Sequence, residues 1–261
     1  MADYQTILFD LSEDVATITL NRPERLNAIT ADMLAEIRDA LDEATAGGAR
    51  ALLLNGDDRA FCSGADLQAA AASGGGSDLG ESLTRDYNPT IAKLAALDMP
   101  VVSAVSGLAA GAGASLALHA DFTIAAKSAY FLLAFVNIGL VPDAGATWLF
   151  AQAMGRTRTL EAAMLGERIY ADRAEEYGLI YRVVADNHVE KEARALAVRL
   201  AAGPTLAYGM IRKSVAAALT SSLEEVLAIE AADQRRAGQS ADCREGVAAF
   251  IEKRDAVFTG K

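Results

Sequence analysis

Two stretches decide the fold of this chain: Phe61-Cys62-Ser63-Gly64-Ala65-Asp66-Leu67 and Ala104-Val105-Ser106-Gly107-Leu108-Ala109-Ala110-Gly111-Ala112-Gly113-Ala114-Ser115-Leu116. Each follows an apolar run, residues 51–54 and 101–105, and each leads into a run that is compatible with a helix. Small residues at such a junction let the backbone approach a ligand closely. Because two separate turns can aim their N–H groups at one oxygen, the pattern predicts an oxyanion hole for an enolate or a tetrahedral oxyanion.

The glycines of the second stretch do not fit two common alternatives. Gly111-Ala112-Gly113 begins like a dinucleotide fingerprint, but Leu116 occupies the third glycine position and Asp121 comes too early to hold a ribose. No Gly-x-Ser-x-Gly motif occurs, and Ser115 has no evident base partner other than His119 and His188. Dinucleotide binding and serine nucleophile chemistry are therefore disfavoured.

Further motifs stand in a recognisable order around these two turns. They are Asn21-Arg22-Pro23-Glu24-Arg25-Leu26-Asn27-Ala28, the segment 139–148, the segment 240–247 and the tail 258–261. Together the motifs resemble the crotonase (enoyl-CoA hydratase/isomerase) superfamily over nearly the whole chain. Within it, the last three segments are most similar to the ring-epoxide isomerases of bacterial phenylacetate degradation.

This resemblance implies an α/β fold: a crotonase-like spiral of ββα units with a C-terminal helical oligomerisation region. We expect residues 1–203 to form the spiral core with a CoA-thioester site, and residues 204–261 to form the helical region. An apolar stripe in the helical region consists of Leu223, Val226, Leu227 and Ile229. The resemblance implies that this stripe packs on neighbouring subunits, giving a homotrimer or a dimer of trimers.

Local patterns add expectations for individual elements. Alternating residues predict a hairpin of strands Thr6 to Asp10 and Val15 to Leu20. Thr30 or Asp32 is expected to cap the helix that follows, and Ser222 to Glu225 has the spacing of a capping box. The small, glycine-rich segment 69–82 predicts a mobile loop over the acyl pocket.

Composition narrows the class of protein. The 261 residues are 52% hydrophobic with a formal net charge of -11, which argues against a general basic surface for nucleic acid. No apolar run reaches the roughly 18 residues that span a bilayer, and the start lacks the basic residues of a signal peptide, so a cytoplasmic enzyme without membrane contact is expected. Cys62 and Cys243 are interpreted as reduced and structural. No Cys/His/carboxylate cluster has metal-ligand spacing, so no metal is predicted.

The resemblance also implies which residues carry the chemistry. The two glutamates with which hydratases add water fall at Ser115 and Phe135 here, so hydratase activity is expected to be lost or weak. Asp143 matches the base of the isomerases. Its alternative role is to cap a helix that begins near Ala144. An apolar pocket would raise the pKa of the Asp143 carboxylate toward useful basicity. The residues expected to supply its walls are Leu132, Leu133, Phe135, Val136 and Trp148.

The remaining site residues follow from the same motifs. The N–H groups of Ala65 and Ala112 are expected to hold the thioester oxygen. The substrate-binding set is Arg25, Ala28, Asp66, Leu67, Gly111 and Lys253, of which Asp66 is expected mainly to cap the helix after it. Because an acidic protein must gather positive charge to bind CoA, the candidates for its phosphates are Arg22, Arg25, Lys253 and Arg254. Any one of these four can instead be a solvated basic side chain.

Three functional hypotheses follow. The leading one is a CoA-thioester isomerase that converts ring 1,2-epoxyphenylacetyl-CoA to oxepin-CoA and shifts Δ3 double bonds of enoyl-CoAs to Δ2. It needs no cofactor, since coenzyme A is part of the substrate. The second is another crotonase reaction on an acyl-CoA, such as hydration. The third is a non-catalytic homologue that binds CoA or RNA, which the acidic composition and the retained Asp143 disfavour.

Overall fold

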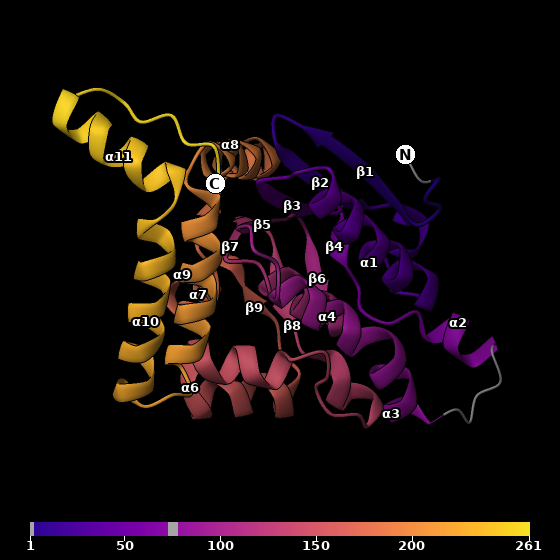
Figure 1. Ribbon diagram of the computed structural model, residues 1–261. Coiled ribbons are helices and arrows are strands. Elements are labelled where there is room, and N and C mark those ends of the chain that lie inside the picture. Colours follow the sequence, from indigo (N-terminus) through magenta and orange to yellow (C-terminus); the bar gives the residue numbers. More distant parts are fainter. Residues whose placement is uncertain (1–2, 73–77) are drawn as a thin grey trace.

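The computed structural model describes residues 3–72 and 78–261, and its elements form two sheets with helices around them (Figure 1). The larger sheet has the strand order β1-β2-β3-β5-β7-β10. Its strands are β1 (Ile7–Ser12), β2 (Val15–Leu20), β3 (Ala51–Asn55), β5 (Val101–Val105), β7 (Phe122–Ala126) and β10 (Arg182–Val184). The smaller sheet contains β4 (Ala60–Cys62), β6 (Leu108–Ala110), β8 (Tyr130–Leu132) and β9 (Ile169–Tyr170) in that order.

The first two strands form the predicted antiparallel hairpin, although β1 begins and ends later than the sequence pattern indicated. Its turn consists of Glu13 and Asp14, both at positive φ (53° and 59°), which is the conformation that two-residue hairpins favour. From β2 onward every neighbouring pair in the larger sheet is parallel. All five residues of β5 are buried, as expected for a strand that is covered on both faces.

The chain alternates between the two sheets. β3 of the larger sheet leads into β4 of the smaller one and then α2 (Leu67–Ala72), and β5 leads into β6 and then α5 (Ala112–Leu118). These are the ββα units that the sequence predicted. β4, β6 and β8 are parallel, so their carboxyl ends meet at one edge of the smaller sheet. The two turns quoted at the outset both leave from that edge.

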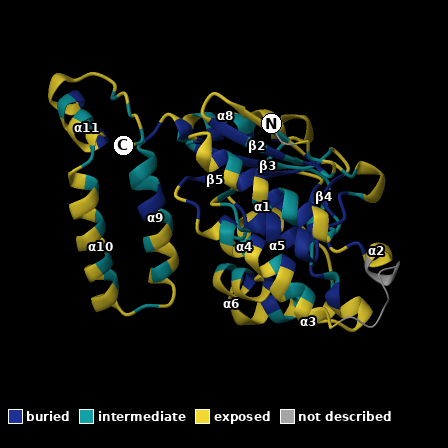
Figure 2. Cartoon of the chain, turned by 45° about the vertical axis from the view of Figure 1, so that its right-hand side comes forward, coloured by how far each residue is buried: buried dark blue, intermediate teal, exposed yellow. Residues whose placement is uncertain are grey.

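Helices cover the sheets on both sides. α8 (Val189–Ala201) covers one face of the larger sheet, while α1 (Ala31–Ala46) and the smaller sheet lie on the other (Figures 1 and 2). Thr30, rather than Asp32, caps α1, since its side chain accepts a hydrogen bond from the Met33 N–H. The other helices of the core are α3 (Leu79–Ser82), α4 (Asn88–Ala95), α6 (Ala146–Leu165) and α7 (Ala171–Glu176). Short helical turns span Pro23–Arg25, Leu83–Tyr87, Ala134–Ile138 and Asp186–His188.

The expectation of a loop across residues 69–82 is wrong at both of its ends, because α2 and α3 occupy them. Aspartates start both helices. The Asp66 carboxylate accepts a hydrogen bond from the Ala69 N–H (3.0 Å), and Asp78 accepts one from Gly80 (2.8 Å). The centre of the expected loop, residues 73–77, lies outside the described residues.

Three C-terminal helices stand beside the sheets: α9 (Thr205–Ala218), α10 (Leu223–Gly238) and α11 (Ala241–Glu252) (Figure 2). The capping box of Ser222 and Glu225 is present at the start of α10. α9 is tied to the core by the Arg212 guanidinium, which pairs with Asp121 at 2.7 Å. The turn between α8 and α9 falls at the domain boundary expected from the sequence, and that division stays a prediction.

The C-terminal tail folds back onto α11. The buried Asp242 carboxylate accepts hydrogen bonds from the Thr259 N–H (2.7 Å) and the Gly260 N–H (2.8 Å). The motifs at 240–247 and 258–261 therefore serve to hold the tail. In the described ranges, no helix is long and apolar enough to cross a membrane. The cytoplasmic location stays a prediction.

Candidate active site

The two glycine turns meet backbone to backbone at the edge of the smaller sheet. Gly64 has φ +94°, and a Cβ there would lie 2.9 Å from the Ala110 carbonyl oxygen. Gly111 has φ +53°, and a Cβ there would lie 3.7 Å from Gly64 Cα. The Gly111 N–H donates to the Leu132 carbonyl (2.8 Å), which fixes the second turn to β8. Residues without side chains therefore allow the two turns to touch, as the sequence predicted.

Each turn presents one N–H group that has no acceptor within the described part of the chain. Ile29 bonds to the residues on either side of Ala65: the Ile29 N–H donates to Gly64 O (2.7 Å), and the Asp66 N–H donates to Ile29 O (2.9 Å). The N–H of the exposed Ala65 is left unpaired between them. Ala112 is the first residue of α5, so its N–H has no partner within the helix. The sequence predicted these two N–H groups as oxyanion donors, and that role stays a prediction.

Asp143 lies in the turn between the segment 134–138 and α6. Ala144 (φ 49°) and Gly145 (φ 83°) both have left-handed backbone conformations, which place α6 directly after the carboxylate. The Ser115 hydroxyl on α5 donates to the Asp143 carbonyl oxygen at 3.3 Å. A Cβ at Gly145 would lie 2.9 Å from the His119 ring, so the close approach requires glycine there. α5 therefore carries one oxyanion donor at its start and also supports the turn that holds Asp143.

The Asp143 carboxylate is held without a protein partner. Its Oδ1 is buried, and no hydrogen bond reaches it from the residues the structure describes. Burial in these surroundings raises the pKa of Asp143 from 3.8 to about 6. A carboxyl group with that pKa is ionised at neutral pH and is a stronger base than an exposed aspartate.

The alternative role for Asp143, as a helix cap, is wrong. α6 begins at Ala146, and its N-cap is Gly145, which has no side chain to cap with. Asp143 contributes only its main-chain oxygen, which accepts a hydrogen bond from the Ala146 N–H (2.9 Å). Its side chain therefore has no role in starting the helix.

An open cavity of about 350 Å³ lies beside the first oxyanion donor. Its lining includes Ala65 and four predicted substrate-binding residues: Arg25, Ala28, Asp66 and Leu67. The Ala69 N–H and the Arg22 guanidinium (2.9 Å) hold the pKa of Asp66 below its usual range, so its carboxylate acts as a helix cap and an ion-pair partner. This agrees with the capping role expected for Asp66. Gly111 is not in this lining, and its role in substrate binding stays a prediction.

Three of the four cations suggested for the CoA phosphates are not free at this cavity within one chain. Arg22 is bound to Asp66 and to the Ala28 carbonyl (2.6 Å). Arg254 pairs with Glu245 and Glu252. Lys253 follows the last residue of α11, which lies on the opposite side of the molecule from α2 (Figure 1). Within a single chain Lys253 does not line the cavity, and its role in substrate binding stays a prediction. Arg25 is the cation in the lining, and its guanidinium donates to the Gln68 side chain at 2.6 Å.

The predicted apolar walls divide into two sets. Leu133 and Phe135 are buried, and the Phe135 ring lies 3.7 Å from the position of a Cβ on Gly111. Val136 and Trp148 are exposed and do not enclose a pocket in the single chain. Ser115 is fully buried, so the two positions that correspond to hydratase glutamates hold a hydroxyl engaged with Asp143 and an aromatic ring.

Sequence reasoning missed Tyr87, a half-buried phenol on the turn Leu83–Tyr87. Burial and then the nearby negative charge of Asp143 raise the pKa of Tyr87 well above its usual value. No motif surrounds this tyrosine in the sequence, so only the folded chain reveals its place.

Both cysteines of the chain lie within the described residues. Cys62 is buried and Cys243 is exposed, and both are unpaired, so a structural role fits Cys62 alone. Burial raises the pKa of the Cys62 thiol to about 12, which keeps it protonated. Among residues 3–72 and 78–261, no group of three His, Cys, Asp or Glu side chains could hold a metal ion.

Two unpaired N–H groups and a carboxylate with a raised pKa, all carried by a spiral of ββα units, are typical of enzymes that stabilise an acyl-thioester enolate. The chain matches the enoyl-CoA hydratase/isomerase family over residues 10–261. It is 45% identical over 258 residues to 1,2-epoxyphenylacetyl-CoA isomerase of Escherichia coli, covering 98% of each chain. It is 47% identical to a protein of Rhodobacter capsulatus named probable enoyl-CoA hydratase, covering 99% of each chain.

Solved structures agree on the fold. The crystal structure of an enoyl-CoA hydratase subunit from Geobacillus kaustophilus superposes with a TM-score of 0.92 at 35% identity, covering 100% of both chains. The chain therefore belongs to the enoyl-CoA hydratase/isomerase family and has the crotonase fold. It is an enzyme of the class that isomerises or hydrates CoA thioesters.

Proposed function

We propose that this enzyme is a CoA-thioester isomerase in which Asp143 moves the proton. The observation that carries the proposal is the half-buried Asp143 carboxylate, whose buried Oδ1 has no partner among the described residues and whose pKa is raised to about 6. The two positions at which hydratases have glutamates hold Ser115 and Phe135, neither of which can act as a general base at neutral pH. Asp143 is thus the base we assign to the site.

The proposed reaction begins when the thioester oxygen accepts hydrogen bonds from the N–H groups of Ala65 and Ala112. Asp143 removes a proton from C2, and the electron pair moves onto the thioester oxygen to form a dienolate that the two donors stabilise. The protonated Asp143 then returns the proton further along the conjugated system. In a 3-enoyl-CoA this means protonation at C4, which leaves the double bond at C2. One carboxyl group serves as base and then as acid.

We further propose that the preferred substrate is ring 1,2-epoxyphenylacetyl-CoA, in which the same proton transfer accompanies opening to the seven-membered oxepin-CoA. Support comes from the motifs at 139–148 and 240–247 and from the name of the E. coli relative. The R. capsulatus relative is named as a hydratase, so hydration is the competing reaction. Because isomerisation leaves the overall oxidation level unchanged, the proposed chemistry needs no cofactor beyond the CoA of the substrate.

The experiment compares wild-type and Asp143→Asn protein with a 3-enoyl-CoA and a 2-enoyl-CoA, and it follows double-bond migration and water addition separately. Loss of one general base typically lowers the rate by about 10² to 10⁴. We expect migration to fall by that factor while binding of CoA thioesters survives. The exposed Asp39 on α1 provides the control, since Asp39→Asn should leave migration unchanged. Migration that persists in Asp143→Asn would remove Asp143 from the mechanism, and dominant water addition by the wild type would favour the hydratase.

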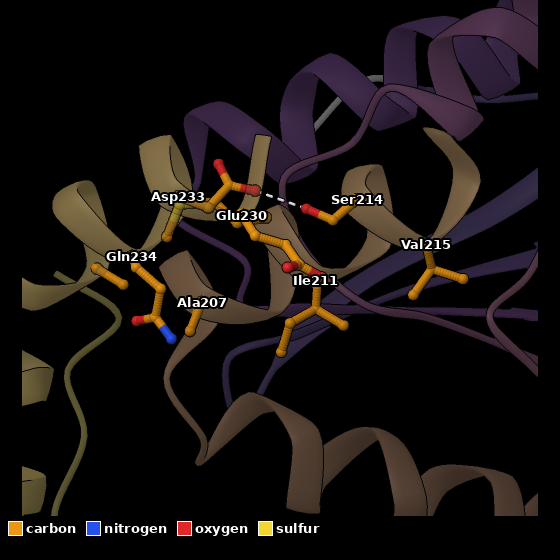
Figure 3. A pocket seen from close by; sticks show the side chains of 9 residues that line it. Ala207, Ile211, Ser214, Val215, Glu230, Asp233 and Gln234 are labelled. Atoms are coloured by element: carbon orange, nitrogen blue, oxygen red, sulfur yellow. Dashed lines mark hydrogen bonds between the residues drawn. The ribbon is translucent and has the colours of Figure 1, made fainter. Parts of the chain in front are cut away.

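We also propose that copies of this chain associate through the C-terminal helices as a homotrimer or a dimer of trimers. Within one chain α10 buries no residue, and Leu223 on its stripe is 75% exposed. A groove of about 450 Å³ between α9 and α10 is lined by apolar side chains such as Ile211 and Val215 (Figure 3). Exposed apolar surface continues onto α11, where Phe250 is 85% exposed. Such a continuous apolar face is typical of a subunit interface.

The proposal includes no nucleic-acid partner and no membrane. A net charge of -11 would repel phosphate backbones and anionic lipid surfaces. An acyl-CoA is also an anion, but it is small enough to be bound by local cations such as Arg25. This part of the proposal fails if the purified protein binds RNA at moderate salt.

A further inference from the structure

Tyr87 ends a helical turn of unusual width just before α4. The N–H of Asn88 donates to the carbonyl of Leu83, which is a hydrogen bond across five residues and marks a π turn. π turns widen a helix by one residue and often occur at functional sites. Here the turn sets the direction in which the Tyr87 side chain leaves the helix.

The neighbouring turn of α4 shows where that side chain lies. Ile91 on α4 contacts the turn that holds the proposed base, since its Cγ2 lies 4.0 Å from the position of a Cβ on Gly145. Tyr87 is four residues earlier on a continuous helix, so it is on the same face, one turn toward the N-terminus. Both side chains pack against the core. The phenol of Tyr87 is therefore next to the Asp143 turn.

The charged groups around the phenol agree with this position. The groups that raise the pKa of Tyr87, after burial, are Asp143, Cys62, Asp86 and Asp66, in that order. Cys62 precedes the first glycine turn and Asp66 follows the Ala65 donor, so the surroundings of the phenol include groups from both the first glycine turn and the Asp143 turn. Its raised pKa keeps it protonated, and it is therefore a hydrogen-bond donor at neutral pH.

Both polar groups at this point have unused bonding capacity. No hydrogen bond joins the Tyr87 hydroxyl to any residue the structure describes. The buried Asp143 Oδ1 also has no partner among those residues, so the two groups do not bond to each other. A hydroxyl with no protein acceptor is free to donate to an acceptor that a ligand brings.

We propose that Tyr87 is a specificity-determining residue, and that its hydroxyl donates a hydrogen bond to an oxygen that the acyl group carries beyond the thioester, such as the oxygen of an epoxide or oxepin ring. The inference rests on the proposed function for the identity of the site. It deepens that function because it explains how a site with an otherwise general proton shuttle favours an oxygen-bearing acyl group over a plain enoyl chain.

The test uses two CoA thioesters that cannot shift a double bond and differ in one ring atom: tetrahydropyran-2-ylacetyl-CoA and cyclohexylacetyl-CoA. The dissociation constants of both are measured with wild type and with Tyr87→Phe. The quantity of interest is the ratio of the two constants, because it removes contributions that the ligands share. Loss of one hydrogen bond is expected to shift this ratio by about fivefold against the ether ligand in Tyr87→Phe.

The controls separate specificity from folding and from general catalysis. Tyr87→Phe removes a hydroxyl that has no partner in the described chain, so its midpoint of urea unfolding should match that of wild type. Tyr181 directly precedes β10, the edge strand of the larger sheet. The control variant Tyr181→Phe should therefore leave the ratio unchanged. With a 3-enoyl-CoA, which has no oxygen in its acyl chain beyond the thioester, Tyr87→Phe should change kcat/KM less than it changes the binding ratio.

The outcomes are distinct. An unchanged ratio in Tyr87→Phe overturns the proposal, and so does an equal weakening of both ligands, which indicates a packing role. A large loss of kcat with the 3-enoyl-CoA also overturns it, because it assigns Tyr87 to general catalysis. Binding of unreactive thioesters does not depend on isomerisation, so failure of the proposed function is detected separately, by the Asp143→Asn comparison.

Discussion

Replacing Asp143 with asparagine should stabilise the folded chain at neutral pH even though it removes the proposed base. Burial raises the pKa of Asp143 from 3.8 to about 6, so the folded state binds this proton more tightly than the unfolded state. The stability that the neutral acid contributes is therefore fully present below about pH 4 and is lost as the pH rises through about 6. Above that pH, the fold holds an ionised carboxylate that it solvates poorly.

The size of the effect follows from the shift. At about 1.36 kcal/mol per unit, a change from 3.8 to about 6 corresponds to about 3 kcal/mol. Because Asp143 is only half-buried, screening by water reduces this to roughly 1 to 2 kcal/mol. Asparagine carries no charge, so the variant should gain that amount near pH 7.5, and most of the gain should be gone near pH 4.

The assay is urea denaturation of both proteins at equal protomer concentration and at the two pH values. Asp242→Asn serves as the comparison, because its carboxylate accepts hydrogen bonds from Thr259 and Gly260 and its replacement should cost stability. If Asp143→Asn also loses stability near pH 7.5, the carboxylate has partners in the folded protein, and the argument from an unpaired buried acid is refuted.

Further predictions concern the rate, the oxyanion hole and the association of subunits. The kcat/KM of the isomerisation should rise with pH through an apparent pKa of about 6, falling to about one tenth near pH 5; a flat profile from pH 5 to 8 would exclude Asp143 as the base. Ala112→Pro should lower the rate by about 10² to 10³ in a folded protein, since proline is tolerated at the first helical position and removes only the N–H; Ala112→Ser, which keeps the N–H, should stay active. Gly64→Ala should cost roughly 1 to 3 kcal/mol in urea unfolding, because its Cβ would lie 2.9 Å from the Ala110 oxygen at φ +94°; an unchanged midpoint would contradict the close contact of the turns. Phe250→Asp should reduce the mass seen in sedimentation, whereas an unchanged mass would place the interface elsewhere.

The features that could be predicted from the sequence are those in which a local residue type fixes the backbone. Glycine at Gly64 and Gly111 indicated the two turns because their positive φ values favour a residue without a Cβ. The cap at Thr30 and the capping box at Ser222 were equally local, and both are confirmed. The unpaired donors at Ala65 and Ala112 followed from where those turns leave their strands.

The features that escaped prediction depend on contacts between distant segments. The start of α6 was misplaced because the left-handed pair at Ala144 and Gly145 delays the helix, and only the packing of Gly145 on His119 shows why. Tyr87 left no trace in the sequence, since a π turn has no distinctive composition. Lys253 does not line the cavity of a single chain, and no local pattern around it indicated that separation.

The two proposed oxyanion donors are main-chain groups, and every residue except proline carries an N–H. The part of the site that would stabilise negative charge is therefore insensitive to most substitutions at positions 65 and 112, provided that the glycine turns keep their shape. The part that would move the proton depends on a single carboxylate on another segment. During evolution, a chain built in this way can change its reaction when the acidic residue moves to another position, while the main-chain groups that bind the thioester oxygen are retained.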